Sequence, residues 1–260
     1  MAVDIGNTQT VLGLFDLDRE EPGANWRMAT EAHRSPDEIG AVCAALFDLR
    51  DRRLEEAEAV IVSSVVPDLT RAYKHLAEDL LGVPFYSVTS EIETGLKNLY
   101  DDPSTVGADR IVNAVAASRC YGFPVIIADS GTATTVCAVD ARGAYRGGAI
   151  LPGLYVSMDA LASRTAKLPR VDLEERPLHA IATNTPDSIL SGFVYGYAGA
   201  IDALIRRFKD ELGTENSLEG LQVIATGGLA PVIVRHCQEI ETLDPDLTLK
   251  GLRILYELNS

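Results

Sequence analysis

The feature that most constrains the fold is a repeated segment. Residues 4–11 read Asp-Ile-Gly-Asn-Thr-Gln-Thr-Val, and residues 129–136 read Asp-Ser-Gly-Thr-Ala-Thr-Thr-Val. The two segments align without a gap, and Asp, Gly, Thr and Val coincide. Each copy places an Asp at the end of a predicted strand, directly before a tight turn that contains Gly. A repeat of this kind, in a chain of 260 residues, predicts two similar domains with a cleft between them.

The order of the predicted elements supports this duplication. In the first half, a hairpin over 2–16 precedes a strand at 25–31, a helix at 36–49, a strand at 59–62, a helix at 68–81 and a strand at 85–88. In the second half, strands at 125–129, 134–139 and 145–151 precede helices at 154–164 and 189–209, a strand at 221–226 and a helix at 229–237. We therefore predict an α/β protein with domains at 1–117 and 118–260.

The charge balance limits the partners. The chain has 23 Lys and Arg against 38 Asp and Glu, a net charge of −15, which argues against nucleic acid and against an anionic membrane. Small anionic ligands remain compatible with it, because backbone N–H groups and a metal ion can bind a phosphate in an acidic protein. The longest uncharged stretch, Ser188 to Ile201, is shorter than the ~20 residues of a membrane helix. We expect a cytoplasmic protein with no membrane partner.

The repeated Asp-x-Gly segments have a clear chemical use. Gly allows the backbone to approach a phosphate, N–H groups and Thr hydroxyls donate to its oxygens, and the Asp can hold a cation directly or through water. The alternative is that both segments form ordinary hairpin turns. A later junction from strand to helix, Thr226-Gly227-Gly228, suits close approach by a nucleoside. The three segments together favour a nucleotide site.

A second candidate is Gly107-Ala108-Asp109-Arg110, which opens the predicted helix continuing through Ser118. Asp109 falls in the first helical turn, where the helix dipole stabilises a carboxylate, and Asp109 and Arg110 are candidate site residues. The structural alternative is that Asp109 only complements that dipole and that Arg110 is its exposed neighbour. No Gly-x-x-x-x-Gly-Lys-Ser/Thr phosphate loop and no zinc-ligand spacing of His residues occurs.

These motifs resemble those of the superfamily that includes sugar kinases, acetate kinase, the Hsp70 ATPase domain and actin. More narrowly, the chain resembles the type III pantothenate kinases. The matching segments run in order along nearly the whole chain: Asp4 to Thr8, Tyr100 to Pro103, Gly107 to Arg110, Asp129 to Thr135, Gly147 to Gly153, Asn184-Thr185 and Gly251-Leu252. The resemblance implies duplicated ribonuclease-H-like domains, as in actin-like ATPases, with a nucleotide cleft between them.

The resemblance also implies an activity, the phosphorylation of pantothenate by ATP to 4′-phosphopantothenate, the first step of coenzyme A synthesis. Asp109 is then the general base that takes the proton of the primary hydroxyl, and Arg110 suits the carboxylate of pantothenate. The implied pantothenate-binding residues are Tyr100, Gly107, Ala108, Asp109, Arg110 and Thr185. Without the resemblance, Tyr100 reads as a turn residue and Thr185 as a residue that precedes a helix.

On the nucleotide side, the resemblance implies a first phosphate loop, with Mg²⁺ near Asp4 through water, and a second phosphate loop at Thr132. It also implies a monovalent cation, K⁺ or NH₄⁺, at Asp129. The segments 147–153 and 166–181 resemble further walls of the site. The first loop comprises Asp4, Ile5, Gly6, Asn7, Thr8, Gln9, Thr10 and Val11.

The resemblance further implies a homodimer, to which the run Phe193 to Tyr197 could contribute; the same run could equally be an intrachain core helix. Two alternative functions remain open from sequence. One is a nucleotide-binding regulator that has kept the fold without catalysis, which a degraded Asp109 or Asp129 would favour, although both are intact. The other is a kinase for a different small hydroxy acid or sugar.

Overall fold

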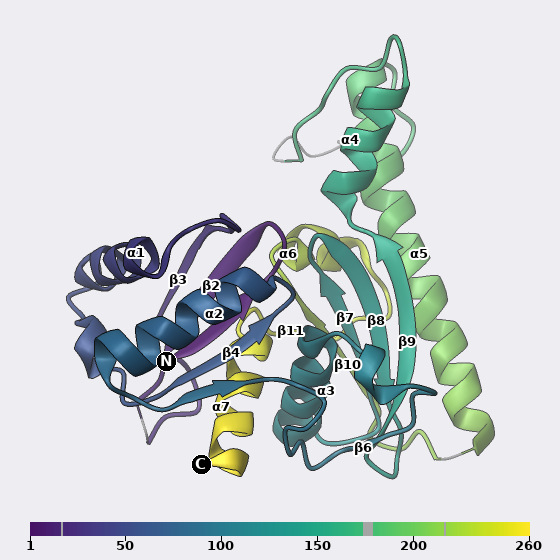
Figure 1. Ribbon diagram of the computed structural model, residues 1–260. Helices are drawn as coiled ribbons and strands as arrows, with labels where there is room; N and C mark the ends of the chain where they lie inside the picture. The colour runs from purple at the N-terminus through teal and green to yellow at the C-terminus, as the bar shows by residue number, and fades with distance from the viewer. Residues whose placement is uncertain (17, 174–178, 216) are drawn as a thin grey trace. The chain divides into compact units, whose positions relative to one another are not determined.

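This computed structural model describes residues 1–16, 18–173, 179–215 and 217–260 (Figure 1). It contains a five-stranded sheet and a six-stranded sheet, and five strands of the second, in the order β9-β8-β7-β10-β11, repeat the order of the first. The first sheet has the order β3-β2-β1-β4-β5, and the second has the order β11-β10-β7-β8-β9-β6. The strands of the first sheet are β1 (Ala2–Ile5), β2 (Gln9–Leu14), β3 (Ala24–Ala29), β4 (Val60–Ser64) and β5 (Phe85–Ser87). Those of the second are β6 (Lys97–Asn98), β7 (Val125–Ser130), β8 (Ala133–Val139), β9 (Ala144–Pro152), β10 (Gln222–Thr226) and β11 (Thr242–Leu243).

Strand directions also repeat. In the first sheet β1, β2 and β3 are antiparallel neighbours, while β1, β4 and β5 are parallel neighbours. In the second sheet β7, β8 and β9 are antiparallel neighbours, while β7, β10 and β11 are parallel neighbours. β1 and β7, which carry Asp4 and Asp129, are therefore the corresponding central strands. The predicted duplicated ribonuclease-H-like fold is confirmed.

The helices follow the predicted pattern, with differences at several ends. Ser35 caps the first helix as predicted, because the Glu38 N–H donates to Ser35 Oγ at 3.3 Å and the Ser35 N–H donates to Glu38 Oε2 at 2.7 Å. The helix predicted at 229–237 is shorter and ends in a 3₁₀ turn, and that predicted at 189–209 extends at both ends. The helical segments are α1 (Pro36–Asp48), η1 (Leu54–Glu56), α2 (Pro67–His75), η2 (Leu76–Leu81), η3 (Pro103–Thr105), α3 (Ala108–Tyr121), α4 (Leu154–Arg164), α5 (Thr185–Glu215), α6 (Ala230–Ile233), η4 (Val234–His236) and α7 (Leu247–Asn259).

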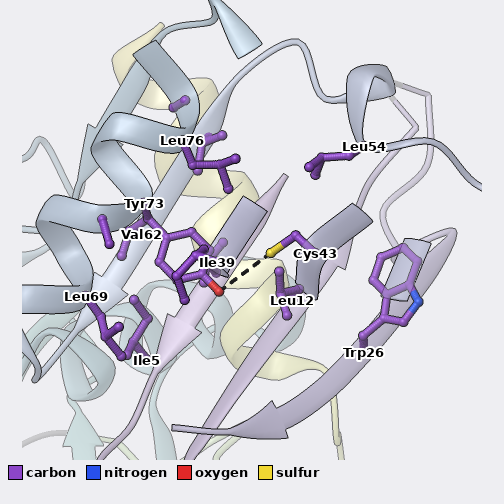
Figure 2. Packing of buried hydrophobic residues seen from close by; sticks show 14 of the residues in the cluster. Ile5, Leu12, Trp26, Ile39, Cys43, Leu54, Val62, Leu69, Tyr73 and Leu76 are labelled. Atoms are coloured by element: carbon purple, nitrogen blue, oxygen red, sulfur yellow. Dashed lines mark hydrogen bonds between the residues drawn. The ribbon is translucent and has the colours of Figure 1, made fainter. Parts of the chain in front are cut away.

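Both faces of the first sheet are covered, because its strands direct apolar side chains to each face. Val3 and Ile5 of β1 face a core shared with α1 and α2, which contribute Ile39 and Tyr73 (Figure 2). Ala2 lies on the opposite face, in a core shared with α3 and α7. Since neighbouring residues of a strand point to opposite faces, Asp4 belongs to the face of Ala2. The strand pattern thus places Asp4 on the side of the sheet that α3 covers.

The second sheet packs against α4, α5 and α6. α5 contributes a stripe of buried apolar residues: Leu190, Val194, Ala198, Ile201 and Ile205. Within the described residues, one helix, Thr185–Thr214, is long enough and apolar enough, by length and composition alone, to cross a membrane. Of this apolar stretch, 39% is buried inside the protein. In the run Phe193 to Tyr197, Val194 is in this core and Phe193 and Tyr197 pack against it.

Contacts divide the chain into two compact units. One comprises Met1–Leu96, Tyr100–Ala116 and Asp246–Ser260, and the other Lys97–Leu99 and Ala117–Pro245. The C-terminal helix α7, which the sequence did not predict, thus joins the first unit, where it contacts β1 and β4. The predicted domains, 1–117 and 118–260, are the two repeated halves of the sequence, and these bounds stay a prediction.

Candidate active site

The predicted first phosphate loop is the tip of the hairpin between β1 and β2. The Gly6 N–H donates to Gln9 O at 3.0 Å and closes the turn, while Asn7, Thr8 and Gln9 are exposed. Asp4 is half-buried, in register with Val11 of β2 and Ser63 of β4. The side chains of Ile5 and Thr10 are buried, so these two residues can reach a ligand only through their backbone. The loop therefore presents backbone and polar side chains at the tip, with a carboxylate at the end of β1.

The predicted acceptor residues other than Thr185 lie at or near the N-terminus of α3, in the same compact unit as Asp4. A Cβ added at Gly107 would lie 2.5 Å from Asp109 Oδ1, so the carboxylate of Asp109 folds back over this glycine. Arg110 is 6% exposed, and its guanidinium lies 5.7 Å from the centre of the Tyr100 ring. Tyr100 and Asp109 are half-buried. The carboxylate of Asp109 and the guanidinium of Arg110 thus belong to consecutive residues at the start of α3. The ring of Tyr100 lies next to the guanidinium.

The predicted second phosphate loop follows β7 and is held from two directions. The Gly153 N–H donates to Thr132 O at 3.0 Å, and a Cβ at Gly153 would lie 2.1 Å from that oxygen. On the other side, Gly227 has φ +92, and a Cβ there would lie 2.4 Å from Asp129 Oδ1. Thr132 itself is exposed. Two glycines therefore allow three chain segments to converge at Asp129.

The Thr226-Gly227-Gly228 turn is the third of these segments. Thr226 is buried and in register with Asp129, because β10 runs parallel to β7. The Leu229 N–H donates to Ser130 O at 3.0 Å. The predicted nucleoside turn and the predicted second phosphate loop are thus joined directly in one compact unit.

Thr185 begins α5 in that second unit and is exposed. It lines a surface pocket of about 710 Å³ together with Leu161, Asn184, Ile189 and Phe193. Asn184 fixes this end of the helix, since its Oδ1 accepts the Asp187 N–H at 2.9 Å. Thr185 is therefore in a different unit from Tyr100 and Arg110. Of the predicted wall segments, 147–153 forms most of β9, whereas 166–181 is only partly described, because 174–178 lie outside the described residues.

Comparison with known proteins decides the family. A family model described as type III pantothenate kinase matches residues 1–207. A type III pantothenate kinase from Rubrobacter xylanophilus is 75% identical over 260 residues, covering 100% of this chain and 98% of the relative. One from Syntrophobacter fumaroxidans is 43% identical over 259 residues, with the same coverage. The chain belongs to the type III pantothenate kinase family.

Solved structures agree with this fold at low sequence identity. The activator of 2-hydroxyisocaproyl-CoA dehydratase from Clostridium difficile, with bound ADPNP, has a TM-score of 0.53 at 14% identity and covers 98% of this chain and 94% of its own. A Campylobacter jejuni protein of the Baf family, described as a transcriptional activator, has a TM-score of 0.59 at 17% identity and covers 98% and 96%. Both likenesses concern the fold alone. The predicted membership of the type III pantothenate kinase family is confirmed.

Two features of this chain do not follow from local sequence patterns. The first is the support of α3 by α7: Thr248 Oγ1 donates to Asn113 Oδ1 at 2.7 Å, and a Cβ at Gly251 would lie 2.3 Å from Val112 O. The second is Asp202, a carboxylate 4% exposed within the apolar stripe of α5. A lone acidic residue between Ile201 and Ile205 was the available signal, since a buried carboxylate requires partners.

Proposed function

We propose that this protein transfers the γ-phosphoryl group of ATP to the primary hydroxyl of pantothenate, giving 4′-phosphopantothenate and ADP, as the first step of coenzyme A synthesis. Membership of the type III pantothenate kinase family over the whole chain carries this proposal. The grouping of Asp109, Arg110 and Tyr100 at the start of α3 supports it, because pantothenate offers a carboxylate and a hydroxyl that suit these side chains.

Asp109 is proposed as the general base. The acceptor oxygen forms a bond to the γ-phosphorus while the bond from that phosphorus to the bridging oxygen of ADP breaks, and the hydroxyl proton passes to a carboxylate oxygen of Asp109. Asp109 lies in the first turn of α3, and a carboxylate oxygen there can accept the proton. Most of the rate enhancement in phosphoryl transfer comes from positioning and charge stabilisation.

Arg110 is proposed to bind the carboxylate of pantothenate, and the other proposed pantothenate-binding residues are Tyr100, Gly107, Ala108 and Thr185. A guanidinium binds a carboxylate through two parallel hydrogen bonds, and the contact with the Tyr100 ring restricts its orientation. Burial of Arg110 strengthens such a pair, because little water competes for it.

We expect Arg110→Lys to raise the KM for pantothenate by about tenfold or more, because an ammonium cannot reproduce the two-bond fork. The KM for ATP is expected to change less than threefold. Steady-state kinetics with each substrate varied in turn measures both constants. Arg119→Lys, at an exposed position of the same helix, is the matched control; equal effects on the two KM values in Arg110→Lys would contradict the assignment.

On the nucleotide side, the loop from Asp4 to Val11 and Thr132 are proposed to bind the phosphates of ATP, and the Thr226 to Gly228 turn its nucleoside. The exposed tip at Asn7, Thr8 and Gln9 supports the first assignment. The close packing of Gly227 on Asp129 supports a connected nucleoside turn and phosphate loop.

The described residues contain no group of three or more His, Cys, Asp or Glu side chains that could hold a metal ion. Mg²⁺ typically uses one or two carboxylates and takes its other ligands from substrate phosphates and water, so Asp4 fits a water-mediated role. Asp129, half-buried at a strand end, is the proposed ligand of K⁺ or NH₄⁺. When bound, these cations neutralise phosphate charge, which suits a protein with a net charge of −15.

Product formation from ATP, Mg²⁺ and pantothenate tests the function. We expect 4′-phosphopantothenate to form, and its rate to rise when K⁺ or NH₄⁺ replaces Na⁺ at constant ionic strength. Sugars and other hydroxy acids in place of pantothenate serve as acceptor controls. Absence of product at every K⁺ concentration would overturn the proposed function. A rate in Na⁺ equal to the rate in K⁺ would exclude the proposed role of a specific monovalent cation.

We further propose a cytoplasmic homodimer. Ile150, Tyr155, Val156 and Ile181 are large apolar side chains exposed by 63%, 49%, 46% and 87% around β9 and the α4–α5 region. A second copy of the chain would bury such a patch. The mass measured by sedimentation velocity tests this.

A further inference from the structure

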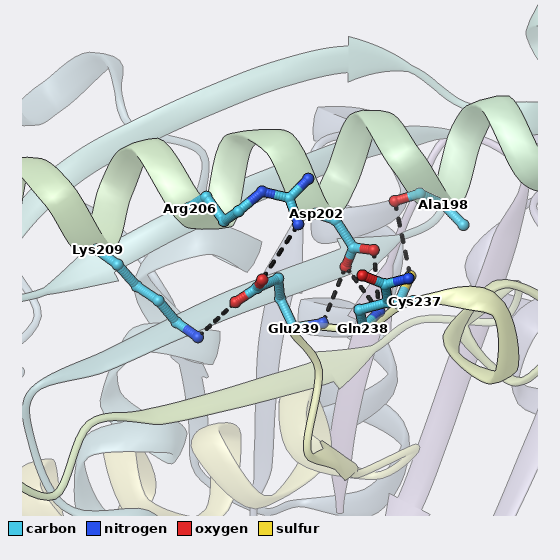
Figure 3. A network of polar contacts seen from close by, with 7 residues as sticks. All are labelled: Ala198, Asp202, Arg206, Lys209, Cys237, Gln238 and Glu239. Carbon is cyan, nitrogen blue, oxygen red and sulfur yellow. Dashed lines mark hydrogen bonds and ion pairs between the residues drawn. The ribbon is translucent and has the colours of Figure 1, made fainter.

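The carboxylate of Asp202 holds a corner of the chain that follows η4 (Figure 3). Its two oxygens accept the Gln238 N–H at 3.1 and 2.9 Å, and Oδ1 also accepts the Glu239 N–H at 3.1 Å. Asp202 is 4% exposed, so this charge is buried and its hydrogen bonds are of the strong, charge-assisted kind. Two consecutive backbone amides are therefore fixed to the middle of α5.

The neighbouring side chains fix the same corner. Glu239 accepts from Lys209 at 2.7 Å and from Arg206 at 3.1 Å, and the hydrogen bond from Lys209 lowers the pKa of the Glu239 carboxyl. Cys237 Sγ lies 3.9 Å from Ala198 O, and burial raises the pKa of this thiol to about 12, so it stays neutral. All the partners on α5 lie within three turns of that helix.

The other end of this segment is the nucleoside turn. Backbone hydrogen bonds are spaced along this segment. The Ala230 N–H donates to Gly227 O at 3.2 Å, the Ile233 N–H to Leu229 O at 3.3 Å, and the Cys237 N–H to Val234 O at 3.0 Å. Gly227 in turn packs on Asp129. The segment 227–239 is thus a short connection, helical over α6 and η4, that is held at one end by the Asp129 loop and at the other by Asp202.

We propose that Asp202 is a positioning residue for ATP, which fixes the Thr226 to Gly228 turn through α6 and η4. This inference rests on the proposed function, in which that turn binds the nucleoside. If Asp202 releases Gln238 and Glu239, the turn is held from the Asp129 side alone, and ATP must order it on binding. ATP affinity then falls, whereas the pantothenate residues at α3 are untouched.

The sharpest test removes one donor and leaves the buried carboxylate in place. Gln238→Pro deletes the N–H that makes two of the three contacts, and Cys237 already has the extended conformation that a following proline requires (φ −83, ψ 149). Gln238→Ala keeps the N–H and is the matched control at this exposed side chain. We expect Gln238→Pro to raise the KM for ATP about tenfold, with the pantothenate KM within twofold of the unchanged protein and Gln238→Ala unaffected.

Asp202→Asn is the second variant, because an amide presents an NH₂ group where an acceptor is needed. We expect a similar increase in the KM for ATP, restored toward the original value in Asp202→Glu. A purely structural role would lower the active fraction and the Tm while leaving both KM values unchanged; that result in the two variants would overturn the proposal. Should Asp202→Asn fail to fold, the Gln238 pair decides alone.

Direct nucleotide binding separates this inference from the proposed function. Isothermal titration with the ATP analogue ADPNP gives the Kd of each variant whether or not pantothenate is phosphorylated. An unchanged protein that binds ADPNP but forms no phosphopantothenate would refute the function, and a tenfold weaker Kd in Gln238→Pro would still support the positioning role. An equal Kd in Gln238→Pro and Gln238→Ala would refute the positioning role.

Discussion

Asp109→Asn is expected to lower kcat for pantothenate phosphorylation by about 10²-fold or more, because the amide cannot accept the hydroxyl proton. ADPNP binding is expected to stay within threefold, since the phosphate loops are unchanged. Asn has the size of Asp, so it can remain folded over Gly107, where Asp109 Oδ1 lies 2.5 Å from the position of a Cβ. Steady-state kinetics together with calorimetry of ADPNP binding measures both effects.

The matched control is Asp101→Asn, an exposed carboxylate close to the same helix. It removes one negative charge without removing the proposed base, and we expect its kcat to stay within twofold of the original value. Comparable losses in the two variants would assign the effect to general electrostatics. A kcat in Asp109→Asn within threefold of the unchanged protein would exclude Asp109 as the base.

The second large effect is expected for Gly153→Ala. Gly153 has φ −65 and ψ 161, values that alanine adopts without strain, so the consequence of the new methyl group is steric. That Cβ would lie 2.1 Å from Thr132 O and 2.5 Å from Gly131 O, inside the second phosphate loop. Since these are backbone atoms, the loop itself must move.

We expect Gly153→Ala to destabilise the protein by about 1–3 kcal/mol, as overpacking typically does, and to weaken ADPNP binding by at least tenfold. Urea unfolding and calorimetry measure the two quantities. Gly199→Ala is the control, because a Cβ at this position of α5 meets nothing within 4 Å. We expect Gly199→Ala to leave binding unchanged and to stabilise the helix slightly. An ADPNP affinity of Gly153→Ala equal to that of the unchanged protein would contradict the proposal that the Thr132 loop binds the nucleotide.

Local patterns predicted most of the elements correctly. The alternation of apolar residues in β1, the capping box at Ser35 and the apolar run at Val125 each depend on neighbours in sequence, and each appears in the structure where it was predicted. The short strands β6 and β11 and the helix α7 were missed. A strand of two residues, such as Lys97–Asn98, has too few residues to show a period, so only its pairing with β9 defines it.

The candidate site divides in the same way. Glycines within the motifs, at Gly6, Gly131 and Gly227, were recognisable from sequence because each stands beside polar residues at the end of an apolar strand. The contacts that these glycines make were not recognisable from sequence, since the contact of Gly227 with Asp129 joins segments far apart in the chain. Asp202 is a stronger case, because its partners are backbone amides, and every residue except proline carries one.

The sequence by itself determined the duplication, the family and the candidate residues, because the repeat at Asp4 and Asp129 and the segment at Asp109 are local patterns in the printed chain. Only the tertiary structure decided that the last helix returns to the first unit and that Asp202 holds the segment after the Thr226 to Gly228 turn. The physical reason is burial: α7 covers the sheet face of Ala2 and Ile61, and Asp202 must satisfy a buried charge. Both depend on neighbours that come together only when the chain is folded.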